Sequence, residues 1–352
     1  MPIVSHKVLR EFVYDIYKGA GGTDEDARIV SDHVVDSNLA GHDSHGVINA
    51  PNYIGGMAGG PSAEKMEIVR ESGAATVINV NGALGMVAAR KAMEMAVEKA
   101  KKCTIGAVGL HRCGHAGRMG EYPPIAANAG MIGIVLLNGG GRFMHPHGGT
   151  SRRLPPNPIA ISVPRANGEP LLLDMTLSVV AGGKLLVQAA RGESIPEGWM
   201  IDTDGNAITD PNDFRERSND TAVMPLGGFQ FGHKGFGLAV MIDAIAGGLS
   251  WAGCSRESPT RGASGIVMFA INISDFIDLV DYEQEIEYLV EWVKSSARMP
   301  GIDELYVPGD FEQRNREKRI KEGIPIEQPT WDRLVEAANR YKVNIPSENN
   351  RL

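Results

Sequence analysis

The sequence is poor in cysteine, in positive charge and in long apolar runs. Its 352 residues include three cysteines, Cys103, Cys113 and Cys254, whose spacing matches neither a disulfide framework nor a metal motif, which favours a reducing, cytoplasmic setting. Acidic residues outnumber basic ones by 43 to 35, and the net charge of -8 argues against a nucleic-acid partner. No uncharged run reaches the roughly 18 residues that cross a bilayer, and the N-terminus lacks the apolar core of a signal peptide. We therefore expect no membrane partner.

Glycine is the residue that the sequence has in excess, with 43 of them. Many stand together, at Gly139–Gly141, Gly148–Gly149, Gly227–Gly228 and Gly247–Gly248. Such clusters suit sharp turns and places where the backbone must come close to a ligand. The rest of the composition, 43% hydrophobic and 22% charged, is that of a globular protein, and the length allows two domains or one large one.

The hydrophobic pattern predicts a helical start followed by strands and helices. Within the first 60 residues, Thr23 is the expected N-cap of a helix that Gly41 ends. Strands are predicted at 75–80, 104–110, 131–137, 159–164, 170–174 and 264–273, the fourth and fifth forming a hairpin. Later helices are predicted at 83–102, 178–190, 233–249, 281–297, 310–322 and 329–341, and 193–214 is turn-rich and irregular. Because strands and helices do not alternate regularly, we expect an α+β fold with a mixed sheet.

The dinucleotide fingerprint Gly-x-Gly-x-x-Gly is absent from the sequence. "GHKGFG" at 232–237 carries the glycines in the reverse spacing and too late in the chain. At the start of a helix, Gly235 and Gly237 would let backbone amides approach an anion, with Lys234 adding charge. The alternative is a glycine-rich helix entry with a solvated lysine. Asp174, at the end of a strand, either accepts hydrogen bonds from a ribose or, as we favour from this stretch alone, caps the next helix.

Histidines gather in three pairs. His42 and His45 lie in "AGHDSHG", His111 and His115 in "LHRCGHAG", and His145 and His147 in "MHPHGG". Histidine titrates near neutrality and suits proton transfer in alcohol or carbonyl chemistry, and the hydroxyl of Ser44 is placed to orient a ring or relay a proton. Metal binding is the weaker alternative, because the ligand set matches no zinc pattern. A third interpretation is that these histidines have a structural role and form hydrogen bonds with backbone groups of the loops.

Eight motifs in order make the chain, from about residue 5 to 325, resemble the type-2 malate/L-lactate dehydrogenase family of sulfolactate-dehydrogenase-like oxidoreductases. They are "NLAGHDSHGV", "GHAGRMGEY", "AGMIGIVLLN", "PHGG…NPIAISVP", "LLLDMTLSVVAGGK", "PEGWMIDTDGNAITDP", "GHKGFGLAVMIDAIAGGLS" and "VPGDFEQRNREKR". The resemblance implies hydride transfer between NAD or NADP, with NAD favoured, and a 2-hydroxy or 2-oxo carboxylic acid. It also implies a homodimer and a cofactor domain that is not a Rossmann fold, at 76–299. Residues 1–75 with 300–352 would form a helical substrate and dimerisation domain.

The resemblance also assigns roles to individual residues. Ser44 and His45 would be the catalytic pair, with His45 as acid/base, and His115 has that role in some relatives and lies by the nicotinamide in others. The implied cofactor contacts are His115, Gly117, Arg118, Met119, Gly139, Asp174, Met175, Thr176, His233, Lys234, Gly309, Asp310 and Phe311.

Departures from the family pattern concern the substrate. Asn49 stands where many relatives have an arginine that pairs with the substrate carboxylate, and Pro156 replaces a threonine that touches substrate. Asn49 could still hydrogen-bond a carboxylate, while Lys184 or Arg142 could supply the charge instead; Arg118, Arg152 and Arg153 are further sources. We therefore expect a bulkier 2-hydroxy acid than lactate or malate. The alternatives are a cyclic imino acid reductase of the same family, a metal-dependent hydrolase or lyase using the histidine pairs, and a binding protein without catalysis.

Overall fold

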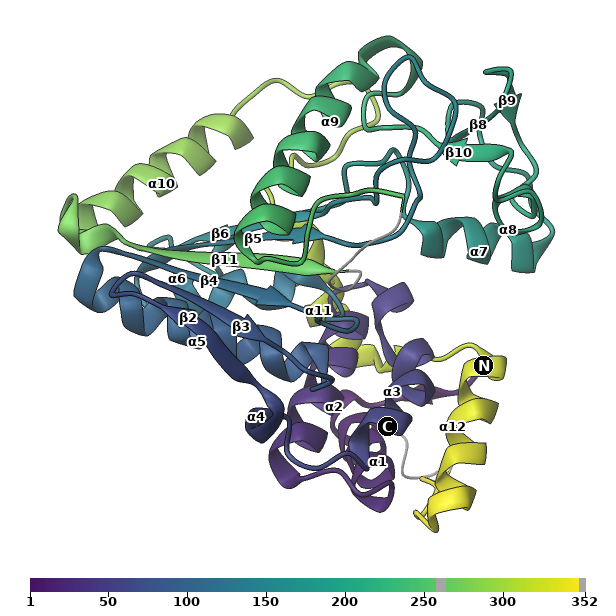
Figure 1. Ribbon diagram of the computed structural model, residues 1–352, viewed down its shortest axis with the longest axis horizontal. Helices are drawn as coiled ribbons and strands as arrows, with labels where there is room; N and C mark the ends of the chain where they lie inside the picture. Colours follow the sequence, from purple (N-terminus) through teal and green to yellow (C-terminus); the bar gives the residue numbers. More distant parts are fainter. Residues whose placement is uncertain (258–263, 348–352) are drawn as a thin grey trace.

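The computed structural model describes residues 1–257 and 264–347, and a seven-stranded mixed sheet forms its centre (Figure 1). The strand order is β2 (Glu67–Glu71), β3 (Ala75–Asn79), β4 (Ile105–His111), β11 (Gly265–Asn272), β5 (Met131–Asn138), β6 (Ile159–Val163) and β7 (Leu171–Met175). β3 and β4 run parallel, and the other neighbouring strands of this order run antiparallel. The predicted mixed sheet and the β6–β7 hairpin are thereby confirmed.

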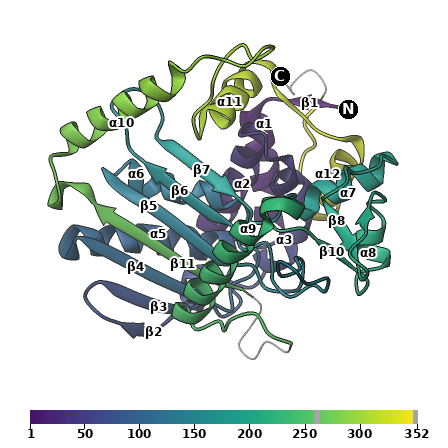
Figure 2. The ribbon, with the colours of Figure 1, turned by 90° about the horizontal axis from the view of Figure 1, so that it is seen from above.

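Helices lie on both faces of this sheet (Figure 1). α5 (Gly85–Cys103) and α6 (Pro123–Ala127) cover one face, and α9 (Gly228–Ile242), continued by the π-helical turn η4 (Asp243–Gly247), packs on the other. Alanines recur along the buried side of α5, so this helix can approach the strands closely. α10 (Leu279–Lys294) stands on the same side as α9 but at the opposite ends of the strands (Figure 2).

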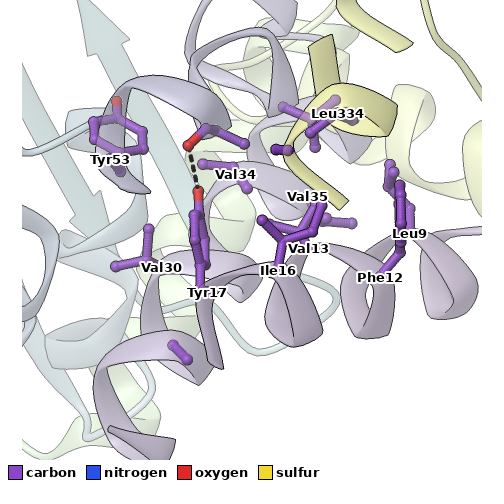
Figure 3. Packing of buried hydrophobic residues seen from close by; sticks show 14 of the residues in the cluster. Leu9, Phe12, Val13, Ile16, Tyr17, Val30, Val34, Val35, Tyr53 and Leu334 are labelled. Atoms are coloured by element: carbon purple, nitrogen blue, oxygen red, sulfur yellow. Dashed lines mark hydrogen bonds between the residues drawn. The ribbon is translucent and has the colours of Figure 1, made fainter. Parts of the chain in front are cut away.

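A helical unit below the sheet joins the two ends of the chain. It contains α1 (His6–Gly19), α2 (Asp24–Leu39), α3 (Ala50–Met57) and α12 (Gln328–Tyr341), and β1 (Ile3–Val4) pairs with β12 (Ile324–Pro325). The hydroxyl of Tyr17 donates to the backbone carbonyl of Ala50 (3.1 Å) inside the shared core (Figure 3). As predicted, Thr23 caps α2, and Gly41, whose φ of 87° suits glycine, follows its end. α11 (Asp310–Glu322) lies against α2.

The stretch 193–214, predicted to be turn-rich and irregular, has the turns but also contains two strands of a small second sheet, so the prediction that it is irregular is wrong. β8 (Met200–Asp202) pairs with β9 (Ala207–Ile208) and with β10 (Thr221–Val223). These strands have two or three residues, too few for alternation to be visible among the turn residues. α7 (Gly182–Arg191) and the short α8 (Asp213–Glu216) accompany them.

Two boundaries differ from the predicted ones. β2 lies in the sheet although its residues fall in the predicted helical part; all five are exposed, so no buried alternation marks the strand. A short α4 (Ser62–Lys65) precedes it. α9 begins at Gly228 rather than at His233, because the glycine pair before it hides the helix start. No helix in the described ranges has the length and apolar character that crossing a membrane requires.

Candidate active site

The turn between α2 and α3, residues 42–49, is fixed from two sides. At the end of α2, the side chain of Asn38 accepts the Val47 N–H (2.8 Å) and donates to Asp43 (2.6 Å). From α11, Arg319 donates two hydrogen bonds to the Asp43 carboxylate (2.6 and 2.9 Å). Glu312 of the same helix lies 3.1 Å from His42 Nε2. The contacts of His42 and Asp43 thus fix the position of the residues that follow them, 44–49.

Three aromatic rings follow one another at this turn. The Ser44 hydroxyl lies 3.2 Å from His45 Nδ1, and the His45 ring stacks on the His115 ring, with centroids 5.8 Å apart and an interplanar angle of 11°. Tyr53 stacks on His115 in turn, and its hydroxyl lies 2.6 Å from His115 Nδ1. The structure therefore brings together Ser44, His45 and His115, which are the three predicted catalytic residues. Tyr53 was not foreseen, because a single tyrosine on α3 carries no motif of its own.

These residues line the largest cavity described, of about 620 Å³. Its wall consists of Ser44, His45, Asn49, Asn52, Tyr53, Gly56, Gly82, Ala83, Leu84, Gly85, Met86, Gly114, His115 and Gly183. The first turn of α7 closes one side: a Cβ added to Gly183 would lie 2.8 Å from the Ser44 Cβ. A larger residue at this position would press on Ser44.

Burial keeps both histidines neutral. Desolvation is the main cause that lowers the pKa of His45 to about 4, and the guanidinium of Arg118 lowers it further. Desolvation also lowers the pKa of His115 and raises the pKa of Tyr53 to about 12. At neutral pH the cavity therefore presents unprotonated imidazoles and a protonated phenol. An imidazole in this state can accept a proton from a substrate hydroxyl.

Arg118 follows His115 and is almost fully buried, with 4% of its surface exposed. Its backbone N–H donates to Nε2 of the buried His33 (2.8 Å), and its Nη2 lies 3.3 Å from Glu121. Nε and Nη1 of Arg118 have no hydrogen-bond partner among residues 1–257 and 264–347. Buried guanidinium donors without acceptors are costly unless a ligand supplies one.

The Asp174 carboxylate accepts a hydrogen bond from a backbone amide of another segment and does not cap a helix. The donor is the Gly120 N–H (2.8 Å), and α7 begins only at Gly182, so the prediction that Asp174 caps the next helix is wrong. Desolvation raises the pKa of Asp174. On the same strand, the Leu172 N–H donates to the Pro308 carbonyl (3.1 Å). These contacts bring three of the predicted cofactor segments, 117–119, 174–176 and 309–311, together at β7, the last strand of the sheet.

The remaining members of these segments have structural contacts of their own. Met119 is buried, and Met175 is half-buried beside α9. The Thr176 hydroxyl donates to the Pro156 carbonyl (3.2 Å). Asp310 accepts the Val307 N–H (3.0 Å) and pairs with Lys294 (2.6 Å). Phe311 is 60% exposed.

The glycine-rich segment 232–237 does not form the start of a helix, which corrects the predicted anion site. α9 begins at Gly228, so the amides of Gly235 and Gly237 belong to its interior, where N–H groups bond to carbonyls one turn earlier. A Cβ on Gly235 would overlap the Leu226 carbonyl, so this glycine permits close packing. Lys234 lies over the Phe231 ring, with Nζ 5.4 Å from the centroid.

Two further predicted cofactor residues lie in α9 and directly after β5. The ring of His233 packs edge-on against His147, with centroids 5.5 Å apart. The carbonyl of Gly139 accepts the Ser264 hydroxyl (3.3 Å). Neither residue lines the cavity of His45.

The predicted substrate residues are placed unevenly. Asn49 lines the cavity, but its side chain donates to the Ser44 carbonyl (2.6 Å) and accepts from Asn52 (3.3 Å), so it supports the turn of residues 42–49. Lys184 is exposed and follows Gly183, which lines the cavity. Arg142 and Arg153 line a different cavity.

Arg152 and Pro156, the other two of these predicted residues, are engaged in hydrogen bonds within the protein. Arg152 is bound to Thr221 and to the Phe214 carbonyl. Pro156 offers its carbonyl to Thr176 and to the Leu177 N–H.

The histidine pairs do not assemble into a metal site. His145 is buried, with Nδ1 2.7 Å from the Pro146 carbonyl and Nε2 3.0 Å from the Met224 sulfur. Throughout the described part of the chain, no three His, Cys, Asp or Glu side chains are grouped so that they could hold a metal ion.

Comparisons with known proteins agree with this arrangement. Residues 4–335 match the sequence profile of a family described as malate/L-lactate dehydrogenase. The chain is 36% identical to a malate dehydrogenase of Pyrococcus horikoshii over 95% of its length and 94% of the relative, and 35% identical to an L-sulfolactate dehydrogenase of Methanocaldococcus jannaschii over 96% of both. The crystal structure of malate dehydrogenase from Entamoeba histolytica matches with a TM-score of 0.91, at 28% identity, over 98% of this chain and 99% of that one. The chain belongs to the malate/L-lactate dehydrogenase family of hydroxyacid dehydrogenases.

Proposed function

We propose that the protein is an NAD(P)-dependent oxidoreductase that interconverts a 2-hydroxy carboxylic acid and its 2-oxo acid, with His45 as acid/base. One observation carries the proposal: an unprotonated His45, held at Nδ1 by Ser44 and stacked on His115, lines a cavity of about 620 Å³. Among the described residues, Ser44 is the hydrogen-bond partner of the His45 ring, and it bonds to Nδ1. Nε2 is then the nitrogen that would meet a substrate.

The residues present fit a nicotinamide dinucleotide. Two buried N–H groups of Arg118 lack an acceptor, and a phosphate or carboxamide oxygen would supply one. Segments 117–119, 174–176 and 309–311 would hold the cofactor, together with His115. Gly139, His233 and Lys234 would contact its other end. The cofactor, when bound, supplies or accepts the hydride.

The chain's own residues handle the proton and the carboxylate. During oxidation, His45 Nε2 removes the hydroxyl proton while the C2 hydrogen leaves as hydride, and during reduction it returns that proton to the oxygen. Ser44 keeps the ring oriented through Nδ1. Lys184, beside the cavity, would neutralise the carboxylate, because Asn49 is engaged with Ser44.

A substrate panel tests the proposal. The full chain is incubated with a broad set of 2-hydroxy acids and NAD or NADP, and with the matching 2-oxo acids and the reduced cofactors, while the absorbance of the reduced nicotinamide is followed. Turnover of at least one acid in both directions is expected. No absorbance change with any acid would overturn the proposal, and turnover of cyclic imino acids alone would replace it by the imino acid reductase.

The pH dependence of oxidation is expected to report the low pKa of His45. Oxidation requires the neutral ring, and a pKa of about 4 keeps it neutral well below the ordinary histidine pKa of about 6.5. kcat/KM for the 2-hydroxy acid should therefore stay level from about pH 8 to about pH 5 and fall as the pH drops through about 4. Reduction needs the protonated ring, so its kcat/KM should decline as pH rises above that value. Circular dichroism at each pH checks that the protein stays folded, and an acid limb near 6.5 would contradict the assignment.

We further propose that the protein is a homodimer that covers the face carrying α9 and α10. Large apolar side chains are exposed there, among them Met241 (57%), Val280 (75%) and Trp292 (78%). Seen from above, the strands between these two helices remain in view (Figure 2). An apolar face of this extent is typical of an interface between protein chains.

Sedimentation analysis checks the dimer. The wild type should have twice the mass of one chain, and Met241→Glu/Trp292→Glu should shift the mass toward one chain because it buries two charges in the contact. Ile320→Glu, at an isoleucine of α11 that is 49% exposed, should leave the mass unchanged. A monomeric wild type would refute the proposal.

A further inference from the structure

A second cavity of the protein, of about 300 Å³, is lined largely by arginine. Its lining residues, which we name the arginine pocket, are Arg142, Arg153, Leu154, Ser255, Arg256 and Glu257. The three arginines come from separate stretches: Arg142 follows the glycines after β5, Arg153 lies before β6, and Arg256 precedes β11. The arginine pocket shares no lining residue with the cavity of His45. Its three cations therefore have no part in the proton transfer proposed above.

Each guanidinium of the pocket is anchored by a backbone carbonyl. Arg142 Nη2 donates to the Glu257 carbonyl (2.9 Å), and Arg153 Nη1 donates to the Arg152 carbonyl (3.0 Å). Arg256 Nε donates to the Cys254 carbonyl (3.3 Å). A guanidinium has five N–H donors, so each of these bonds fixes the head and leaves most donors for a ligand.

Among the described residues, no salt bridge compensates the charge of the arginines in the pocket. Nine other described arginines form salt bridges with carboxylates. Within residues 1–257 and 264–347, no carboxylate forms a salt bridge with Arg142, Arg153 or Arg256, although the chain has a net charge of -8 and Glu257 stands at the pocket. Three like charges around one cavity repel each other, so an anion placed among them gains from all three.

The chemistry of the arginines selects the kind of anion. Guanidinium groups bind oxyanions through paired N–H donors, and three of them offer more donors than the two oxygens of a carboxylate can use. A phosphate group has three terminal oxygens and a charge of roughly −2 at neutral pH. We propose that the arginine pocket binds a phosphate group.

Two sources could present such a group. Arg142 follows Gly139, and Leu154 precedes Pro156, so the pocket adjoins segments that we place near cofactor and substrate. The phosphate is then either the 2′-phosphate of an NADP-type dinucleotide or that of a free phosphorylated small molecule. The phosphate site is independent of the proposed function, and only the dinucleotide source depends on it.

Inorganic phosphate is the probe that tests the site. Thermal unfolding of the full chain is followed while sodium phosphate replaces sodium chloride at constant ionic strength, which yields an apparent phosphate affinity. Arg153→Gln/Arg256→Gln removes two guanidiniums and keeps Arg142. Its affinity should fall about tenfold or more, since hydrogen bonds between charged groups each contribute about that factor.

The matched control is Arg70→Gln/Arg191→Gln. It has the same change in charge at two exposed arginines whose side chains form no hydrogen bond or salt bridge among the described residues, and it should keep the wild-type affinity. If the double pocket variant does not fold, Arg256→Gln alone serves. No phosphate effect on the wild type, or equal losses in pocket variant and control, would overturn the proposal.

Titrations with NADPH and NADH, followed by protein fluorescence, separate the two sources. A loss of NADPH affinity in the pocket variant, with NADH affinity unchanged, assigns the pocket to the 2′-phosphate. Unchanged affinities for both dinucleotides, with phosphate affinity lost, assign it to a free phosphorylated molecule. Because the phosphate titration needs no turnover, failure of the substrate panel leaves this result readable.

Discussion

Replacing His45 by alanine is expected to lower kcat by about 10²–10⁴-fold, the contribution typical of a general acid or base. His45 lines the cavity with its Nδ1 3.2 Å from the Ser44 hydroxyl, and alanine leaves the substrate proton without the proposed acceptor. Cofactor affinity should stay near the wild-type value, because Arg118 and Asp174 keep their contacts. Steady-state turnover and a fluorescence titration of the reduced cofactor measure the two quantities.

His6→Ala is the control for this variant, because His6 lies at the start of α1, outside the cavity. Its turnover should equal that of the wild type. Tyr53→Phe removes the partner of His115 but not the His45 ring, so its loss should be smaller. If His45→Ala turned over at the normal rate while His115→Ala did not, the proton-transfer role would belong to His115.

The sequence is a better guide to which residues meet in the candidate active site than to the contacts that hold them in place. "AGHDSHG" and "LHRCGHAG" by themselves leave proton transfer, metal binding and a structural role open. The resemblance carried by the eight motifs assigns the acid/base roles to His45 and His115, and the structure places the two rings side by side. The contacts that position them join distant residues, such as Arg319 with Asp43 across 276 positions. Pairings of this kind leave no periodic signal, since either side chain is an ordinary surface residue in its own segment.

Predictions from local sequence patterns were wrong where contacts between distant segments decide the role of a residue. Gly235 and Gly237 have the composition of an anion-binding turn, yet Gly235 serves close packing on Leu226 inside α9. Asp174 stands where a helix cap is common, yet the amide that it accepts comes from Gly120, in a segment 54 positions away. Thr23 and Gly41 were predicted correctly because a cap depends on residues within one turn of itself.

The same dependence on packing leads to the largest expected effect on stability, at Gly117. Gly117 has a φ of 68°, and an added Cβ would overlap the ring of His33, which accepts the next N–H, that of Arg118. Gly117→Ala therefore adds backbone strain, a steric overlap and the loss of a buried hydrogen bond. We expect the free energy of unfolding to fall by about 3–5 kcal/mol, as measured by urea denaturation.

Gly141→Ala separates the backbone strain from the overlap. Gly141 has a φ of 80° with no atom within 4 Å of its added Cβ, so alanine there should cost only about 1–2 kcal/mol. A double-mutant cycle with His33→Ala isolates the contact, because without the ring the Gly117→Ala penalty should shrink to the Gly141→Ala value. Equal penalties for Gly117→Ala with and without His33 would show that the ring does not set the cost. Because His115 lies two residues before Gly117, the packing of this glycine on α2 also helps to fix where the His115 ring stands beside His45.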